Sequence, residues 1–135
     1  MAALTKDRDT PMRASDIYVH PVKAATVIFA GSLVCLDAAG NAQPGAVATT
    51  LTAVGRAESH VDNSGGAAGD ETVHGQRGVF RFANSSAGDL IARTEIGDDC
   101  YVVDDQTVAK TSGTNTRSVA GKVRDVDAQG VWVEI

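Results

Sequence analysis

The last nineteen residues, 117-RSVAGKVRDVDAQGVWVEI-135, decide the fold class because they contain two strand patterns joined by a turn. Residues 117–126 and 131–135 are rich in valine, and the Asp-Ala-Gln-Gly sequence between them is typical of a tight connection. Within the final run the aliphatic residues share one face, opposite Trp132 and Glu134. The pattern predicts an antiparallel hairpin with one buried face.

The same alternation of short β-branched runs and turn residues extends upstream as far as Ile17. Strands are predicted over residues 17–20, 25–29, 32–36, 51–58, 71–74, 79–83, 100–103 and 107–110. Turns or loops are predicted over residues 37–41, 62–69, 75–78, 84–88, 104–106 and 111–116. Only residues 89–95 favour one or two helical turns, with Asp89 as the cap. No crossover helices separate the strands, so we expect an all-β fold, a small antiparallel barrel or a sandwich-like body.

The composition agrees with a single β-rich domain. Alanine, valine and threonine supply 50 of the 135 residues, whereas aromatic residues make up 4%. A core built from small and β-branched side chains favours strands over a bundle of long helices. A chain of this length has room for one domain, which we place at residues 17–135, with an extended arm at residues 1–16.

The arm is predicted from its polarity. Residues 5–16 contain six charged residues and a proline, with no apolar periodicity. Such a segment cannot bury enough surface to offset the entropy cost of ordering it. The sequence leaves two interpretations open: a frayed terminus, or an arm that becomes ordered on a partner.

Charge and hydropathy exclude several classes of protein. The net charge of −5 and the scattered basic residues argue against direct binding of nucleic acid, which needs clustered Lys and Arg. No apolar run approaches the roughly 18 residues of a membrane span, and the N-terminus lacks the apolar segment of a signal peptide. Cys35 and Cys100 are too few for a disulfide scaffold. We therefore expect synthesis in a reducing cytoplasm with both thiols free.

A search for catalytic and ligand-binding motifs finds none. His20, His60 and His74 lack the spacing of metal ligands, and the glycine-rich loop at residues 65–69 lacks the features of a phosphate-binding loop. The aspartate pairs at residues 98–99 and 104–105 are typical of turns. We expect no enzyme activity, no cofactor, no metal, and no catalytic or cofactor-binding residue.

Several stretches nevertheless resemble a known family. They are 3-ALTKDRDTP-11, 31-GSLVCLDAAG-40, 54-VGRA-57, 78-GVFRFAN-84, 100-CYVVDDQTVAKT-111, 120-AGKVRDVD-127 and 130-GVWVEI-135. Together they are similar to the small capsid cement, or head decoration, proteins of tailed bacteriophages and prophages. The similarity rests on the overall pattern across the chain, since none of these stretches is a catalytic motif.

The resemblance implies a structural virion protein, made in the bacterial host cytoplasm, that binds the outer surface of the expanded head. Proteins of this kind bridge subunits of the major capsid protein and stabilise the shell against the pressure of packaged DNA. They typically form homotrimers near three-fold and quasi-three-fold axes. Neither a membrane nor nucleic acid is expected as a direct partner.

For such a role, the arm is the predicted point of contact with the capsid. An extended arm can add a strand to an exposed sheet edge, and three arms on a trimer would bind with avidity. Leu4 would anchor the arm, while Arg8 and Arg13 would pair with capsid carboxylates. The predicted contact residues are Leu4, Thr5, Arg8, Thr10, Pro11 and Arg13.

Two other functions were weighed. A small β-domain displayed on the head could bind a ligand such as host-surface carbohydrate, with Tyr18, Tyr101 and Trp132 as the candidate stacking residues. Two of these on one exposed face would favour that function. An OB-like or SH3-like nucleic-acid barrel is the third alternative, and the negative net charge disfavours it.

Overall fold

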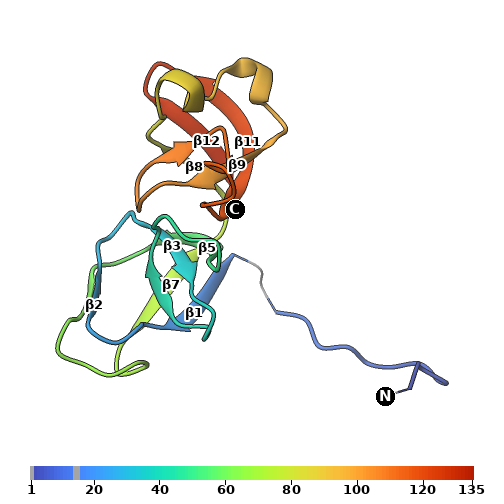
Figure 1. Cartoon of the computed structure of the whole chain (residues 1–135). Coiled ribbons are helices and arrows are strands. Elements are labelled where there is room, and N and C mark those ends of the chain that lie inside the picture. Colours follow the sequence, from blue (N-terminus) through green and yellow to red (C-terminus); the bar gives the residue numbers. More distant parts are fainter. Residues whose placement is uncertain (1, 14–15) are drawn as a thin grey trace.

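The computed structural model describes residues 2–13 and 16–135, so Met1, Ala14 and Ser15 of the predicted arm lie outside the described residues. It confirms an all-β fold with antiparallel sheets. The alternative of a closed barrel is wrong, because neither five-stranded sheet of the described chain closes on itself, and the body is sandwich-like. Figure 1 shows the strands stacked in two halves, with the N-terminal arm extending away from them.

The first half of the body is a five-stranded sheet with a short ribbon beside it. The sheet has the order β1-β7-β5-β3-β4, and β2 pairs with β6 in the ribbon. The strands are β1 (Ile17–Pro21), β2 (Thr26–Ile28), β3 (Leu33–Leu36), β4 (Ala42–Pro44), β5 (Thr52–Ala57), β6 (Val61–Asn63) and β7 (Thr72–Gln76).

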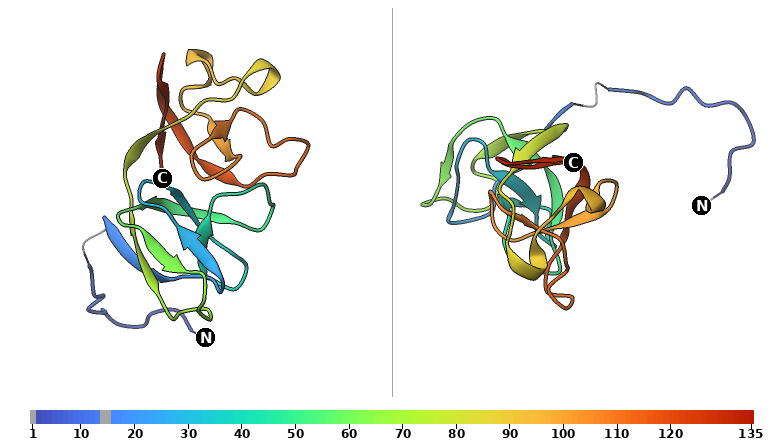
Figure 2. Two further views of the ribbon diagram at one scale, coloured as in Figure 1. Left: turned by 90° about the vertical axis from the view of Figure 1, so that its left-hand side faces the viewer. Right: turned by 90° about the horizontal axis from the view of Figure 1, so that it is seen from above.

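The second half is a five-stranded sheet of order β10-β9-β11-β12-β8. Its elements are β8 (Val79–Phe82), β9 (Asp99–Val102), β10 (Val108–Ala109), β11 (Val119–Asp127) and β12 (Gly130–Glu134), with the 3-10 turns η1 (Ala87–Asp89) and η2 (Arg93–Glu95) before β9. The predicted C-terminal hairpin is confirmed as β11 and β12, with a bulge between Val123 and Asp125. Figure 2 shows its long strands rising above the first half.

Strand β3 separates two hydrophobic cores. Its side chains alternate between them: Leu33 and Cys35 pack in the core of the second half, whereas Val34 packs in the core of the first. All three are completely buried. A strand with no polar alternation is typical of a sheet that is covered on both faces. Leu33, Val34 and Cys35 therefore lie between two apolar layers of the same chain.

Backbone and side-chain hydrogen bonds also join the two halves. Leu33 donates its backbone N–H to the carbonyl oxygen of Asp105 at 2.8 Å. The buried Ser118 hydroxyl donates to the carbonyl oxygen of Ala48 at 2.6 Å and accepts from the N–H of Leu51 at 3.1 Å. Residues 45–51 are thereby held against β11.

Three local predictions need correction. Residues 61–63 form β6 within a segment predicted largely as loop, because the buried Asn63 amide donates to three backbone carbonyls there. Asp89 does not cap a helical turn: Ser86 occupies the cap position of η1, and Asp89 ends it. Phe29, placed in the strand predicted over residues 25–29, lies just beyond the end of β2 and is 60% exposed, with its ring 5.3 Å from that of His60.

Candidate interaction surface

The arm is the most exposed part of the described chain. Residues 2–13 are all exposed and form no helix or strand. The six predicted contact residues all lie in this segment, and the Leu4 side chain is 73% exposed. Met12, which sequence reasoning missed, is 96% exposed. Its position as an isolated apolar residue in a polar segment was the feature of the sequence that could have indicated Met12 as a contact residue.

The arm joins the body at the edge of the first sheet. Arg77 donates its backbone N–H to the carbonyl oxygen of Asp16 at 2.7 Å, which fixes the start of β1 against the end of β7. At the other end of the strand, Val22 donates its backbone N–H to the carbonyl oxygen of Glu71 at 2.9 Å. In an antiparallel pair, alternate residues of a strand hydrogen bond to its partner, so the backbone N–H and C=O groups of Ile17 and Val19 point away from β7.

Ile17 and Val19 also expose their side chains, by 50% and 55%. Because β1 is an edge strand, these two residues present both apolar side chains and backbone hydrogen-bonding groups at the root of the arm. No turn or loop backbone group of the described chain is hydrogen bonded to either residue. The edge therefore continues the exposed backbone of the arm into the body.

A groove of about 550 Å³ lies between the two halves of the body and includes Arg77, whose backbone N–H holds Asp16. Its lining combines aliphatic side chains with two arginines and several small polar residues. The lining residues are Thr49, Leu51, Thr52, Ala53, Arg77, Arg117, Ser118, Val119, Ala120, Gly121 and Ile135. Val119, on β11, is 44% exposed there. Figure 1 shows that the C-terminal end of the chain and the start of β1 lie close together.

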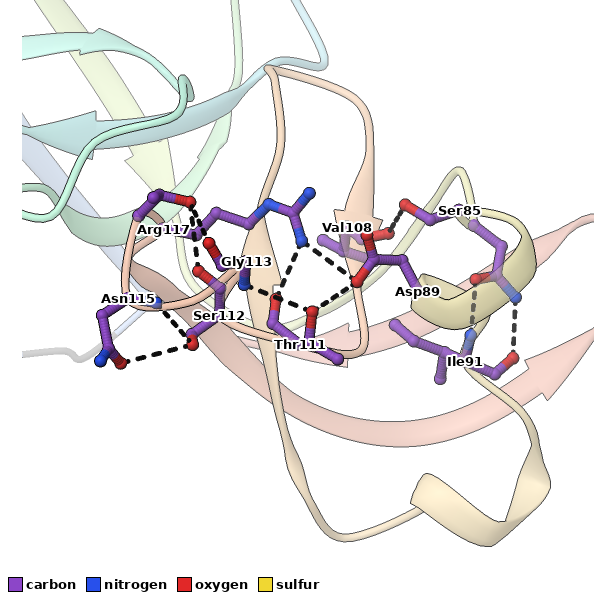
Figure 3. A network of polar contacts seen from close by, with 11 residues as sticks. Ser85, Asp89, Ile91, Val108, Thr111, Ser112, Gly113, Asn115 and Arg117 are labelled. Carbon is purple, nitrogen blue, oxygen red and sulfur yellow. Dashed lines mark hydrogen bonds and ion pairs between the residues drawn. The ribbon is translucent and has the colours of Figure 1, made fainter.

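A polar network holds one of these arginines in place (Figure 3). Arg117 donates from Nη1 to the carbonyl oxygen of Thr111 at 3.0 Å and pairs with the Asp89 carboxylate at 3.2 Å. The Thr111 hydroxyl also donates to Asp89. This hydrogen bond, followed by the contact with Arg117, lowers the pKa of the Asp89 carboxyl from its ordinary value. Arg117 is therefore fixed by the protein itself.

Arg77 differs from Arg117 in having no carboxylate beside it. Among the described residues no hydrogen bond or ion pair engages its side chain, although its backbone anchors Asp16. The body as a whole is acidic: residues 17–135 contain nine basic and fourteen acidic residues. The arm, residues 1–16, contains three basic and three acidic residues and carries no net formal charge. Within the described chain, Arg77 is thus a cation without an ion-pair partner on an acidic body.

The aromatic residues proposed for ligand stacking do not come together. Tyr18 lies on β1 in the first sheet, opposite Gly75. Tyr101 and Trp132 lie in the second sheet but pair with opposite ends of β11, at Val119 and Asp125. The Trp132 indole N–H donates to the Asp127 carboxylate at 2.9 Å. Among the described residues, no two of these three rings form a stacking platform.

The cysteines and histidines occupy ordinary structural positions. Cys35 and Cys100 are buried in one core as free thiols, and burial raises the pKa of each to about 12. Desolvation lowers the pKa of the half-buried His20. Across residues 2–13 and 16–135, no group of three or more His, Cys, Asp or Glu side chains is arranged to hold a metal ion.

Comparisons with models of protein families, with curated proteins and with solved structures found no match for this chain. Within the described residues, no helix has the length and hydropathy needed to cross a membrane.

Proposed function

We propose that this chain is a structural virion protein that binds the outer surface of the expanded head of a tailed bacteriophage. There it bridges subunits of the major capsid protein and stabilises the shell against the pressure of the packaged DNA. The observation that carries the proposal is the arm: twelve exposed residues joined to a well-packed β body at an open sheet edge. The resemblance of the sequence to capsid cement proteins supplies the class of partner.

The arm has the chemistry that strand addition requires. Its backbone is extended and free to pair with an edge of a capsid sheet, which gives affinity through main-chain hydrogen bonds. Leu4 and Met12 offer apolar anchors, while Lys6, Arg8 and Arg13 offer positive charge. Each main-chain hydrogen bond contributes roughly 0.5–1.5 kcal/mol net, whereas ordering one residue costs about 1–2 kcal/mol, so a single arm would bind weakly. Several arms on one assembly would gain affinity through avidity.

A homotrimer near the three-fold axes belongs to the same proposal. The burial of β3 on both faces is explained by the two cores of one chain, so this strand is not evidence for an interface between copies. The trimer is supported by the resemblance and by the avidity that three arms would give.

Co-sedimentation with phage heads tests the proposed function. The purified chain is mixed with expanded, empty heads assembled from the major capsid protein encoded with it, and separately with procapsids. We expect saturable binding to the expanded heads and much weaker binding to the procapsids. A chain that pellets with neither particle would refute the proposal.

A further inference from the structure

We infer that the groove beside Arg77 binds an extended segment of the major capsid protein in which a carboxylate lies next to an aliphatic side chain. This inference rests on the proposed function and identifies a second point of contact, on the body itself. It assigns a role to residues that the arm hypothesis leaves without one.

The lining of the groove defines the aliphatic part of the ligand. Leu51, Ala53 and Val119 contribute apolar groups to a space of about 550 Å³ that is open to solvent. Val119 remains 44% exposed on a strand whose next residue, Ala120, is buried. An aliphatic side chain of a partner that covered Val119 would remove apolar surface from water, which favours binding.

Arg77 defines the charged part of the ligand. Of the two arginines in the groove, Arg117 is already paired with Asp89, whereas Arg77 has no carboxylate partner in the described chain. A guanidinium group suits a carboxylate because it can donate two parallel hydrogen bonds to it. The groove therefore favours an acidic segment over a basic or a purely apolar one.

The position of the groove identifies the capsid protein as the partner. Arg77 is one of the residues that line the groove, and its backbone N–H holds Asp16, at the root of the arm. Whatever protein the arm engages is therefore brought to the margin of the groove. Once the arm is bound, contact at the groove becomes intramolecular and profits from a high effective concentration.

Charge reversal tests the contact with Arg77. Arg77→Glu leaves the backbone hydrogen bond to Asp16 in place and should weaken binding to expanded heads at least tenfold. Lys23→Glu is the matched control, because Lys23 is exposed and lies outside the groove. Within the described chain, the only hydrogen bond of its side chain is the 3.4 Å contact with Gln43. It should bind within twofold of the wild type. Wild-type affinity in the Arg77→Glu variant would overturn the inference.

A crosslink from within the groove identifies the occupant. In a Thr52→Cys variant the new thiol lines the groove and is exposed, whereas the native Cys35 and Cys100 are buried with the pKa of each raised to about 12. Labelling with a benzophenone maleimide, irradiation on expanded heads and peptide mass spectrometry then reveal the neighbour. A Gly65→Cys variant, labelled in an exposed loop, is the control.

The expected product joins the Thr52→Cys variant to a peptide of the major capsid protein that contains Asp or Glu beside an aliphatic residue. The Gly65→Cys control should give no such product. A crosslink to a second copy of this chain, or none from protein that binds heads normally, would overturn the inference and leave the proposed function standing. Failure of the wild-type chain to bind heads would instead remove the proposed function, and the inference with it.

Discussion

Replacing residues of β3 tests whether the two halves of the body fold as one unit. Neighbouring residues of this strand belong to different cores, because Leu33 packs in the second half and Val34 in the first. If the halves are coupled through β3, damage to either core should destabilise both sheets. A single domain over residues 17–135 is the prediction at stake.

The expected magnitudes follow from burial. Both side chains are completely buried. Leu33→Ala should lower the free energy of unfolding by about 2–5 kcal/mol. Val34→Ala removes two methyl-sized groups at about 0.8 kcal/mol each, or about 1.6 kcal/mol before any cavity term. Against a total stability of about 5–15 kcal/mol, both losses are measurable.

Urea denaturation, followed by two probes, measures the coupling. Trp132 is the only tryptophan and lies on β12, so its fluorescence reports on the second sheet. Hydrogen exchange at Val73 on β7 reports on the first sheet. Val34→Ala should lower the midpoint of the Trp132 transition by roughly 0.5–1.6 M, given a urea dependence of about 1–3 kcal/mol per M. If Val34→Ala speeds exchange at Val73 but leaves the Trp132 transition unmoved, the halves unfold independently and the reasoning is refuted.

Three further predictions concern the arm and two polar contacts. Deletion of residues 1–15 should leave the urea midpoint unchanged but weaken attachment to expanded heads more than tenfold; wild-type occupancy by the truncated protein would mean that the body alone makes the contact. Ser118→Ala should cost about 1–3 kcal/mol of stability, because the buried N–H of Leu51 loses its acceptor; an unchanged urea midpoint would contradict this. The Trp132 indole N–H and the backbone N–H groups of Gln129 and Gly130 lower the pKa of the Asp127 carboxyl. The ionised carboxylate therefore stabilises the fold above the ordinary pKa of about 3.9, and this stabilisation is lost as the pH falls through the lowered pKa. Trp132 fluorescence should follow that titration in the wild type and not in Asp127→Asn.

Strands with a clear period of two were predictable from the sequence. The C-terminal hairpin shows this best: Val131, Val133 and Ile135 alternate with other residues in the last run, and a tight turn at residues 128–129 joins β11 to β12. The shortest strands were not predictable in this way. Strand β6 has three residues and is fixed by hydrogen bonds from Asn63 to backbone groups about forty positions earlier, a contact that local patterns do not encode.

Of the candidate interaction surface, only the arm was predictable from the sequence. The arm stands out in the sequence because its charges and proline are contiguous. The groove does not, since Arg77 lies between β7 and β8 whereas Val119 lies on β11, and the two line one groove only in the folded chain. The burial of β3 on both faces likewise becomes visible only in the folded chain, where both covering layers belong to the chain itself.

The most direct test of the proposed function is a difference map between reconstructions of expanded heads with and without this chain bound. We expect added density on the outer surface, near the three-fold and quasi-three-fold axes, with the arm extended along a subunit of the major capsid protein. Density inside the shell, or heads that stay undecorated at saturating protein, would contradict it.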